Sequence, residues 1–254
     1  MTGMVGHLLE HLPDGEVLDL VLGARWTAVA MQVEGERRCG LAATMCGPGD
    51  DFTTLMPSMS ATRWPRGGRA LAELAQSEDP VAASVGMAAI NSLLPRLEHL
   101  WLDLHAEAAI ARLGAGRVVA MVGRFPFAED LADQVGELVV LERDPGPRDL
   151  PEAKAPDILP RAQVVAITGM AVVNHSIEEL LRFCSPNATV IVVGPSTPLS
   201  PLLFEDRPDL LSGAVVNDVD GVLHAVRTGA AFREIRRAGA RLVTMARPGT
   251  FPLA

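Results

Sequence analysis

Glycine and hydroxyl residues follow two strongly β-branched runs in the second half of the chain, at 163–168 and 189–193. They are Thr168, Gly169, Gly194, Ser196 and Thr197. Continuous β-branched runs are typical of strands buried on both faces of a parallel sheet. The carboxyl ends of such strands meet at one edge, where open α/β sheets bind their ligands. The hydroxyls and amides beside Gly194 could hold an oxyanion or a phosphate, or they could only order a proline-rich turn.

Gly123 and Glu142 have the spacing of a nucleotide site. Each ends an expected strand, and an acidic residue about 20 positions after a first glycine holds the ribose in dinucleotide-binding folds. Arg124 and Phe125 follow Gly123, however, so the glycine-rich phosphate loop of those folds is missing. This disfavours a dinucleotide and favours an adenosyl-type or other small anionic ligand. The alternative is that Glu142 only pairs with Arg124 or Arg143 in a solvated loop.

Two helices carry further polar residues. Asn174 is expected to cap a helix at 176–184, whose free amides would attract an anion, although capping alone would also explain this residue. Arg233, Arg236 and Arg237 form a small basic group, which is interpreted as the solvated face of a helix.

Few side chains qualify as metal ligands. Cys46 lies in a loop rich in glycine and proline, and it and Glu142 are the two candidates. The other two cysteines fall in an expected strand and at a helix end, where burial is expected. His7 and His11 share one helical face but lack the further ligand pattern of a metal site, so a solvated face is favoured.

The composition limits the partners of the protein. The chain has 254 residues and a net charge of −9, which disfavours nucleic acid and anionic membranes. Three cysteines in a chain of this length argue against a disulfide framework and for a reducing compartment. There is no signal-peptide pattern, and the longest apolar run, at 162–173, is too short to span a bilayer. A cytoplasmic location is therefore expected.

The pattern of elements predicts two domains. Residues 1–104 read as a smaller α+β domain: a short helix, a β-rich stretch at 17–33 returning as a hairpin at 37–44, and two helices at 69–76 and 80–94. Residues 105–254 alternate strands with short helices, which predicts an α/β fold with a doubly wound, mostly parallel sheet. The expected strands are 117–122, 137–142, 163–168, 189–193, 212–217 and 241–245.

Several motifs in this order resemble those of one bacterial and archaeal family, described as "Putative heavy-metal chelation". They lie at 86–91, 122–127, 141–143, 151–152, 159–160, 166–169, 174, 178–181 and 194–199. The resemblance implies a Rossmann-like C-terminal domain that follows a domain similar to the N-terminal domain of enolase. It also implies a site in the cleft between them, lined by Asn91, Gly123, Phe125, Glu142, Thr168, Gly169, Asn174, Ser196 and Thr197. Arg124 stands where many relatives are expected to carry histidine.

The resemblance and the polar strand ends together favour a protein that binds or handles a metal or a metal chelate in the interdomain cleft. The alternative is an enzyme that acts on a small anionic or adenosyl-type ligand at the strand ends. A third hypothesis is a binding module or scaffold without catalysis. No nucleophile–base pair is recognisable, so the sequence assigns no reaction. A homodimer is also expected, because the N-terminal sheet would have exposed edges.

Overall fold

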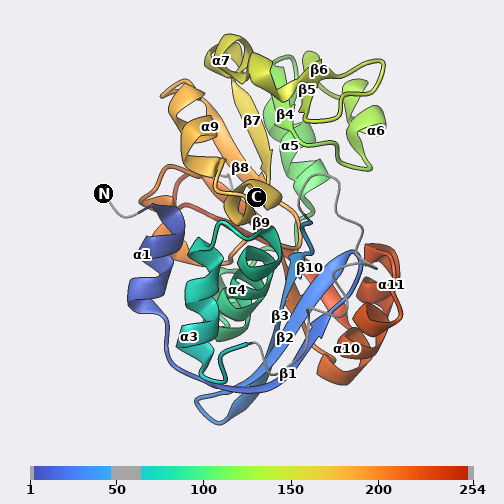
Figure 1. The fold of residues 1–254 in the computed structure, drawn as a ribbon. Helices are drawn as coiled ribbons and strands as arrows, with labels where there is room; N and C mark the ends of the chain where they lie inside the picture. Colours follow the sequence, from blue (N-terminus) through green and yellow to red (C-terminus); the bar gives the residue numbers. More distant parts are fainter. Residues whose placement is uncertain (1–2, 47–63, 251–254) are drawn as a thin grey trace.

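The N-terminal half is built around a small antiparallel sheet. The computed structural model describes residues 3–46 and 64–250. Helix α1 (Met4–His11) precedes strands β1 (Glu16–Leu22), β2 (Trp26–Val33) and β3 (Glu36–Ala43), which pair in the order β1-β2-β3 (Figure 1).

The hairpin expected around residues 34–36 is confirmed, because β2 and β3 pair antiparallel across that turn. The β-rich stretch expected at 17–33 is two strands, however, so the sheet is a three-stranded meander. The chain turns at Gly23, whose N–H donates to the carbonyl of Trp26 at 2.9 Å. A Cβ on Gly23 would lie 2.5 Å from the carbonyl oxygen of Val226, so only glycine allows this turn to pack against helix α10 (Val219–Arg227).

Helices cover both faces of this small sheet. Alternate residues of β2 point in opposite directions, so Val29 and Met31 pack in the core with α4 (Pro80–Leu93), whereas Ala28 and Ala30 pack with α10. Gly40 of β3 lets α4 approach so closely that a Cβ there would collide with the helix backbone. Before α4 come α3 (Gly68–Ala72) and η3 (Glu73–Gln76).

The C-terminal half confirms the expected α/β fold. Its seven-stranded sheet has the order β10-β9-β8-β7-β4-β5-β6, in which β10 is antiparallel to β9 and the other neighbours are parallel. The order reverses between β4 and β7, which is the place where doubly wound sheets bind ligands. The strands are β4 (Val118–Val122), β5 (Glu137–Glu142), β6 (Leu150–Pro151), β7 (Val164–Thr168), β8 (Thr189–Val193), β9 (Leu210–Val216) and β10 (Ala240–Ala246).

Helices lie on both faces of this sheet, as the buried clusters show. One face packs with α5 (Ala106–Gly114) and α6 (Ala128–Ala132), and the other with α7, α8 and α9. The remaining elements are η4 (Glu98–Leu100), η5 (Glu152–Lys154), α7 (Ala155–Ile158), η6 (Leu159–Arg161), α8 (Met170–Val173), α9 (Ile177–Phe183), η7 (Pro201–Phe204) and α11 (Phe232–Arg237). None of the helices in the described ranges combines the length and hydropathy that a membrane span requires.

The two halves share their packing. Helix α10 belongs to the C-terminal half of the chain but covers the N-terminal sheet. Leu102 pairs with Thr244 of β10, and its N–H donates to the Thr244 carbonyl at 2.7 Å. A division at 104/105 therefore stays a prediction, since the segment just before it already contacts the large sheet.

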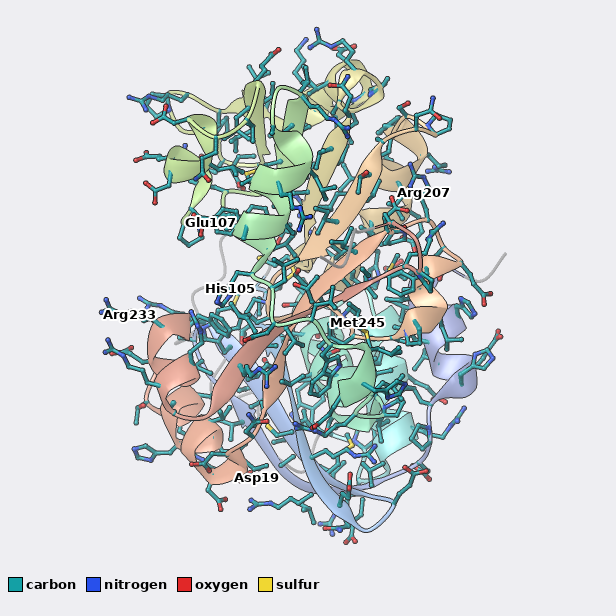
Figure 2. The ribbon with its side chains drawn as sticks, turned by 180° about the vertical axis from the view of Figure 1, so that it is seen from behind. Asp19, His105, Glu107, Arg207, Arg233 and Met245 are labelled. Carbon is teal, nitrogen blue, oxygen red and sulfur yellow. The ribbon has the colours of Figure 1, made fainter. Side chains whose placement is uncertain are left out.

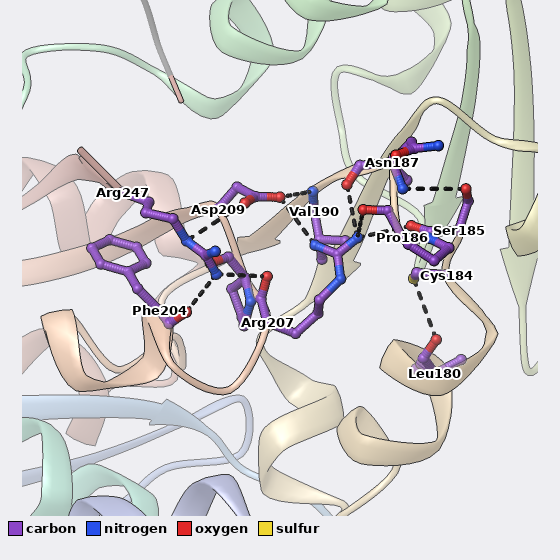
Figure 3. Close-up of polar contacts among 12 residues, drawn as sticks. Leu180, Cys184, Ser185, Pro186, Asn187, Val190, Phe204, Arg207, Asp209 and Arg247 are labelled. Atoms are coloured by element: carbon purple, nitrogen blue, oxygen red, sulfur yellow. Dashed lines mark hydrogen bonds and ion pairs between the residues drawn. The ribbon is translucent and has the colours of Figure 1, made fainter. Parts of the chain in front are cut away.

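An arginine–aspartate cluster fixes the long connection between β8 and β9 (Figure 3). Arg207 has a φ of +113°, a backbone region that non-glycine residues rarely adopt. Its guanidinium donates to the Ser185 and Ala188 carbonyls at 2.8 and 2.9 Å and to Asp209 at 3.2 Å. Arg247 reaches the same loop from beyond β10 and donates to the carbonyl of Arg207 at 3.1 Å. These bonds hold the segment that carries the predicted site residues after β8.

Candidate functional site

The ends of β4, β7 and β8 come together at the point where the strand order reverses. Gly123 has a φ of +95°, and a Cβ there would lie 2.9 Å from the Thr168 Cβ. Gly169 in turn packs closely against the turn that follows β8. A Cβ added at Gly169 would lie only 2.6 Å from Thr197 Oγ1. The structure thus brings four of the sequence-predicted residues into one contiguous edge.

The turn at 194–197 joins the two halves of the molecule. Gly194 has a φ of +125°, and its carbonyl accepts a hydrogen bond from Thr197 N–H at 2.9 Å. Ser196 is buried, and its Oγ accepts the N–H of Ala43, at the end of β3, at 2.8 Å. Asn91 Nδ2 donates to the carbonyls of Leu41 at 2.9 Å and Ser196 at 3.3 Å. Asn91 and Ser196 are therefore in contact across the seam between the two halves of the chain.

The Glu142 carboxylate accepts hydrogen bonds from two backbone N–H groups. Its Oε2 accepts the N–H of Arg124 at 2.6 Å, and its Oε1 accepts the N–H of Arg143 at 3.2 Å. The carboxylate that has the spacing of a ribose-binding residue thus holds the loop after Gly123. The Arg124 guanidinium instead pairs with Asp149 at 2.6 Å, which lowers the pKa of the Asp149 carboxyl.

Asn174 does not cap a helix N-terminus, so that prediction was wrong. It ends α8, and its Oδ1 accepts bonds from the N–H and the hydroxyl of Ser176 at 3.1 and 2.7 Å. Ser176 is the residue that precedes α9. Asn174 therefore orders the turn between two helices, and its side-chain oxygen is occupied there.

A pocket among the described residues lies at the sheet edge, between the start of α5, the loop after β4 and α11. It has a volume of about 630 Å³ and includes Phe125 and Gly194 among its lining residues. Residues 194–195 supply part of its floor at the end of β8. Figure 2 shows His105 and Glu107 at the start of α5 and Arg233 on α11, on the face of the molecule away from the viewer of Figure 1. We name this hollow the sheet-edge pocket.

Aromatic and charged side chains surround the sheet-edge pocket. Phe125 and Phe127 stack with their ring centroids 5.4 Å apart and 11° between the ring planes. Arg233 and Arg236 line the pocket from α11, and both are exposed. They make no ion pair within the part of the chain that the structure describes. The interpretation of this helix face as merely solvated missed them, because nothing local distinguishes a pocket rim from an ordinary charged face.

A second, smaller hollow lies at the seam between the halves. It has a volume of about 40 Å³ and is lined from β3, from the end of α4, by Trp101, by Thr197 and by the end of β9. Asn91 and Thr197 are the predicted cleft residues that reach it. We name it the seam cavity.

The metal-ligand candidates do not form a cluster. Within residues 3–46 and 64–250, no three histidine, cysteine or acidic side chains gather closely enough to hold a metal ion. Cys46 is half-buried. Burial raises the pKa of the Cys39 thiol to about 12 and that of the Cys184 thiol to about 11, so both stay protonated near neutral pH.

Two family models match the chain. The model named DUF364 covers residues 107–245, the model named DUF4213 covers 6–94, and both carry the description "Putative heavy-metal chelation". The chain belongs to the DUF364 family. This confirms the resemblance found in the motifs. No curated protein matches the chain.

Solved structures show the same fold. A DUF364 family protein of unknown function from Desulfitobacterium hafniense is 28% identical, with a TM-score of 0.81 over 96% of this chain and 97% of that one. A second DUF364 protein of unknown function, from Pyrococcus horikoshii, is 17% identical, with a TM-score of 0.80 over 96% and 98%. At that identity the second likeness shows the fold alone.

Proposed function

We propose that this DUF364 protein binds a metal as the complex of a small organic chelator, and that the sheet-edge pocket is the binding site. The observation that carries the proposal is the pocket itself, which combines a volume of about 630 Å³ with stacked aromatic rings and unpaired guanidinium groups. Pockets of about 300–1,000 Å³ with mostly apolar walls and a few polar groups are typical of small-molecule sites.

The lining suits a planar, acidic chelator. The partly exposed ring of Phe127, backed by the buried ring of Phe125, provides a flat apolar surface on which a planar ring can stack. Arg233 and Arg236 can pair with carboxylates, since a guanidinium presents donors in the geometry that a carboxylate accepts. Glu107 and Asp130 add negative charge from α5 and α6, which suits a bound cation with an exposed side.

The donor set favours a chelate over a free ion. No metal-ligand cluster forms among the described residues, so the chelator would supply most of the donor atoms. The family description supports a metal as part of the ligand.

The size of the two hollows favours the sheet-edge pocket as the binding site. The interdomain cleft was the predicted location, and the seam cavity is the hollow that the described residues form there. Its volume of about 40 Å³ corresponds to roughly three water molecules, which is too small for a chelate. The turn at 194–197 borders both hollows, so the sheet-edge pocket keeps the predicted strand end as its wall.

Calorimetric titration tests the proposal. The probes are Zn²⁺, Ni²⁺, Co²⁺, Cu²⁺ and Fe³⁺, each free and as the complex with pyridine-2,6-dicarboxylate, together with the chelator alone. We expect saturable heat with at least one complex and none with its free ion. Binding of free ions as tightly as of complexes would contradict the proposal, as would the absence of heat and thermal shift with every probe.

The chain offers a matched control for the pocket. The double variant Arg233→Gln/Arg236→Gln removes both guanidinium groups and should weaken binding of the complex by about tenfold or more, since hydrogen bonds to charged groups contribute about 1.5–3 kcal/mol. Arg237→Gln changes an exposed arginine of the same helix that does not line the pocket, and should leave binding unchanged. Equal effects of the two changes would show that only the overall charge matters.

The volume of the sheet-edge pocket also suits the alternative, an enzyme for an adenosyl-type ligand. Glu142 argues against this function, because its oxygens already accept two loop N–H groups. Native mass spectrometry of freshly purified protein separates the two functions: a retained adenosyl compound that Glu142→Ala releases would favour the enzyme.

A further inference from the structure

The seam cavity gathers buried polar atoms that have no partner. Arg38 Nη1, Asn91 Oδ1, Trp101 Nε1 and Thr197 Oγ1 are all buried without a hydrogen bond to the protein, and all four residues line the cavity. Buried polar groups are almost always paired, because leaving one unpaired costs about 1–3 kcal/mol. Four residues that each carry such an atom line one small space, and this concentration points to a polar occupant of that space.

Three of these atoms belong to hydrogen-bond donors. Arg38 and Trp101 can only donate, and the Thr197 hydroxyl can donate or accept. The side chain of Arg38 is 10% exposed, and its Nη2 atom pairs with Glu34 and Glu36 at 3.2 Å, which leaves Nη1 for the cavity. Thr197 is 1% exposed. The two glutamates are well exposed, so their carboxylates lie on the solvent side of the guanidinium.

The charge of the lining is positive. Arg38 and Arg96 line the cavity, and no carboxylate does so among the described residues. The Arg96 guanidinium lies 5.3 Å from the centre of the Trp101 ring, and its Nη1 donates to the Val216 carbonyl at 2.8 Å. Glu98, its ionic partner at 3.1 Å, is well exposed. Positive charge together with unpaired N–H and O–H groups on the lining residues suits an anion.

Asn91 distinguishes among anions. Its Nδ2 donates to two backbone carbonyls, which fixes the amide so that Oδ1 is the atom left unpaired. An acceptor at this position repels a bare anion such as nitrate or chloride, but it accepts a hydrogen bond from an anion that retains a hydroxyl group. A volume of about 40 Å³ also limits the occupant to a few heavy atoms.

We propose that the seam cavity is a binding site for a small oxyanion that carries one hydroxyl group, of the class and size of hydrogen carbonate. Its charged oxygens accept from Arg38, Trp101 and Thr197, and its hydroxyl donates to Asn91. The site lies between β3, α4 and β9, so occupation links the two halves of the molecule. This inference goes beyond the proposed function, because the chelate occupies a different hollow.

Titration with sodium hydrogen carbonate tests the inference, with nitrate, formate and chloride as comparison anions at constant ionic strength. Binding is followed by calorimetry and by the thermal midpoint. We expect saturable binding of hydrogen carbonate, and at least tenfold weaker binding of the anions without a hydroxyl group. Equal binding of all the anions would overturn the claim, and no saturable effect of hydrogen carbonate would show that water alone fills the cavity.

Single-atom changes locate the site. Trp101→Phe removes the indole N–H, Thr197→Val removes the hydroxyl, and each should weaken hydrogen carbonate binding by about tenfold or more. Thr197→Ser should restore it, which separates the hydroxyl from the packing of its methyl group. Trp26→Phe is the matched control, because its Nε1 is also buried without a partner but lies outside the cavity. Unchanged binding in Trp101→Phe, or equal loss in Trp26→Phe, would overturn the assignment.

Discussion

The hydrogen bond between Ser196 and Ala43 ties the two halves of the protein together, and Ser196→Ala tests how strongly. The Oγ atom is 2.8 Å from Ala43 N, and the two residues are only 2% and 7% exposed. Alanine at 196 leaves the Ala43 N–H buried and unpaired. The expected cost is about 1–3 kcal/mol of unfolding free energy, the usual penalty for a buried donor without an acceptor.

Ser185→Ala is the matched control for this change. Ser185 Oγ also accepts a backbone N–H, from Asn187 at 3.4 Å, but at an exposed position where water can replace the bond. Its loss should change the unfolding free energy by no more than about 0.5 kcal/mol.

Urea unfolding followed by circular dichroism measures both variants. Equal slopes with denaturant concentration would show that only stability changed, and the thermal midpoint should fall by about 2–4 °C for each kcal/mol lost. If Ser196→Ala costs no more than Ser185→Ala, the seam is wet or loose, and the reasoning from burial is refuted.

Three further predictions concern titratable groups. His7 donates a hydrogen bond to the Asp206 carboxylate, which raises the pKa of His7. His7→Asn should therefore lose about 0.5 kcal/mol of unfolding free energy at pH 5.5, where the unfolded histidine is also protonated, and nothing above the folded pKa. Urea unfolding at pH 5.5 and 9 checks this, and an equal loss at both would contradict it. Cys39 and Cys184 should not react with a thiol reagent at pH 8 until the protein unfolds, because burial raises the pKa of both thiols. A spectrophotometric count of reactive thiols before and after adding denaturant tests this, and more than one fast-reacting thiol in the folded protein would contradict it. Glu142→Gln should lower the unfolding free energy by about 1 kcal/mol, because it removes one acceptor for the loop N–H groups, and it should leave chelate binding unchanged. Urea unfolding and calorimetric titration of the same sample test both parts. Lost binding with unaltered stability would show that Glu142 contacts the ligand.

Local signals in the sequence identified six of the seven strands of the large sheet and missed only the two-residue strand β6. The β-branched run at 189–193 is β8 in the structure, and the run at 137–142 is β5, with the same bounds. Every residue of β8 is β-branched, which is typical of a strand covered on both faces, so its composition identifies it without tertiary information. β5 is half-exposed over most of its length, and its apolar centre between turn signals identified it. The doubly wound α/β class followed from the repetition of strands and short helices, and the family resemblance implied its Rossmann-like type.

Contacts between distant segments were not predictable in the same way. A single glycine within a β-rich stretch is compatible with one bulged strand or with two strands, and the approach of Val226 to Gly23 decides between them. Asn174 and Ser176 are both good cap residues, and the choice depends on where α8 ends.

The candidate site also combines residues that a local pattern identifies with residues that only tertiary packing brings together. The strand-end residues were found because glycine and hydroxyl residues after a buried strand are a local pattern. His105 and Arg233 lie far apart in the chain, and only the packing of α5 and α11 over the sheet edge brings them to one pocket. Asn91 was indicated by the family resemblance alone, since its contact with Ser196 spans 105 positions.

The turn at 194–197 belongs to the walls of both hollows. Gly194 and Pro195 line the sheet-edge pocket, Thr197 lines the seam cavity, and Ser196 between them holds the end of β3. The bond from Thr197 N–H to the Gly194 carbonyl closes the turn, and proline at 195 and 198 restricts its backbone. The two hollows therefore share one restrained wall segment, and Ser196 within it is bonded to the end of β3 in the N-terminal sheet.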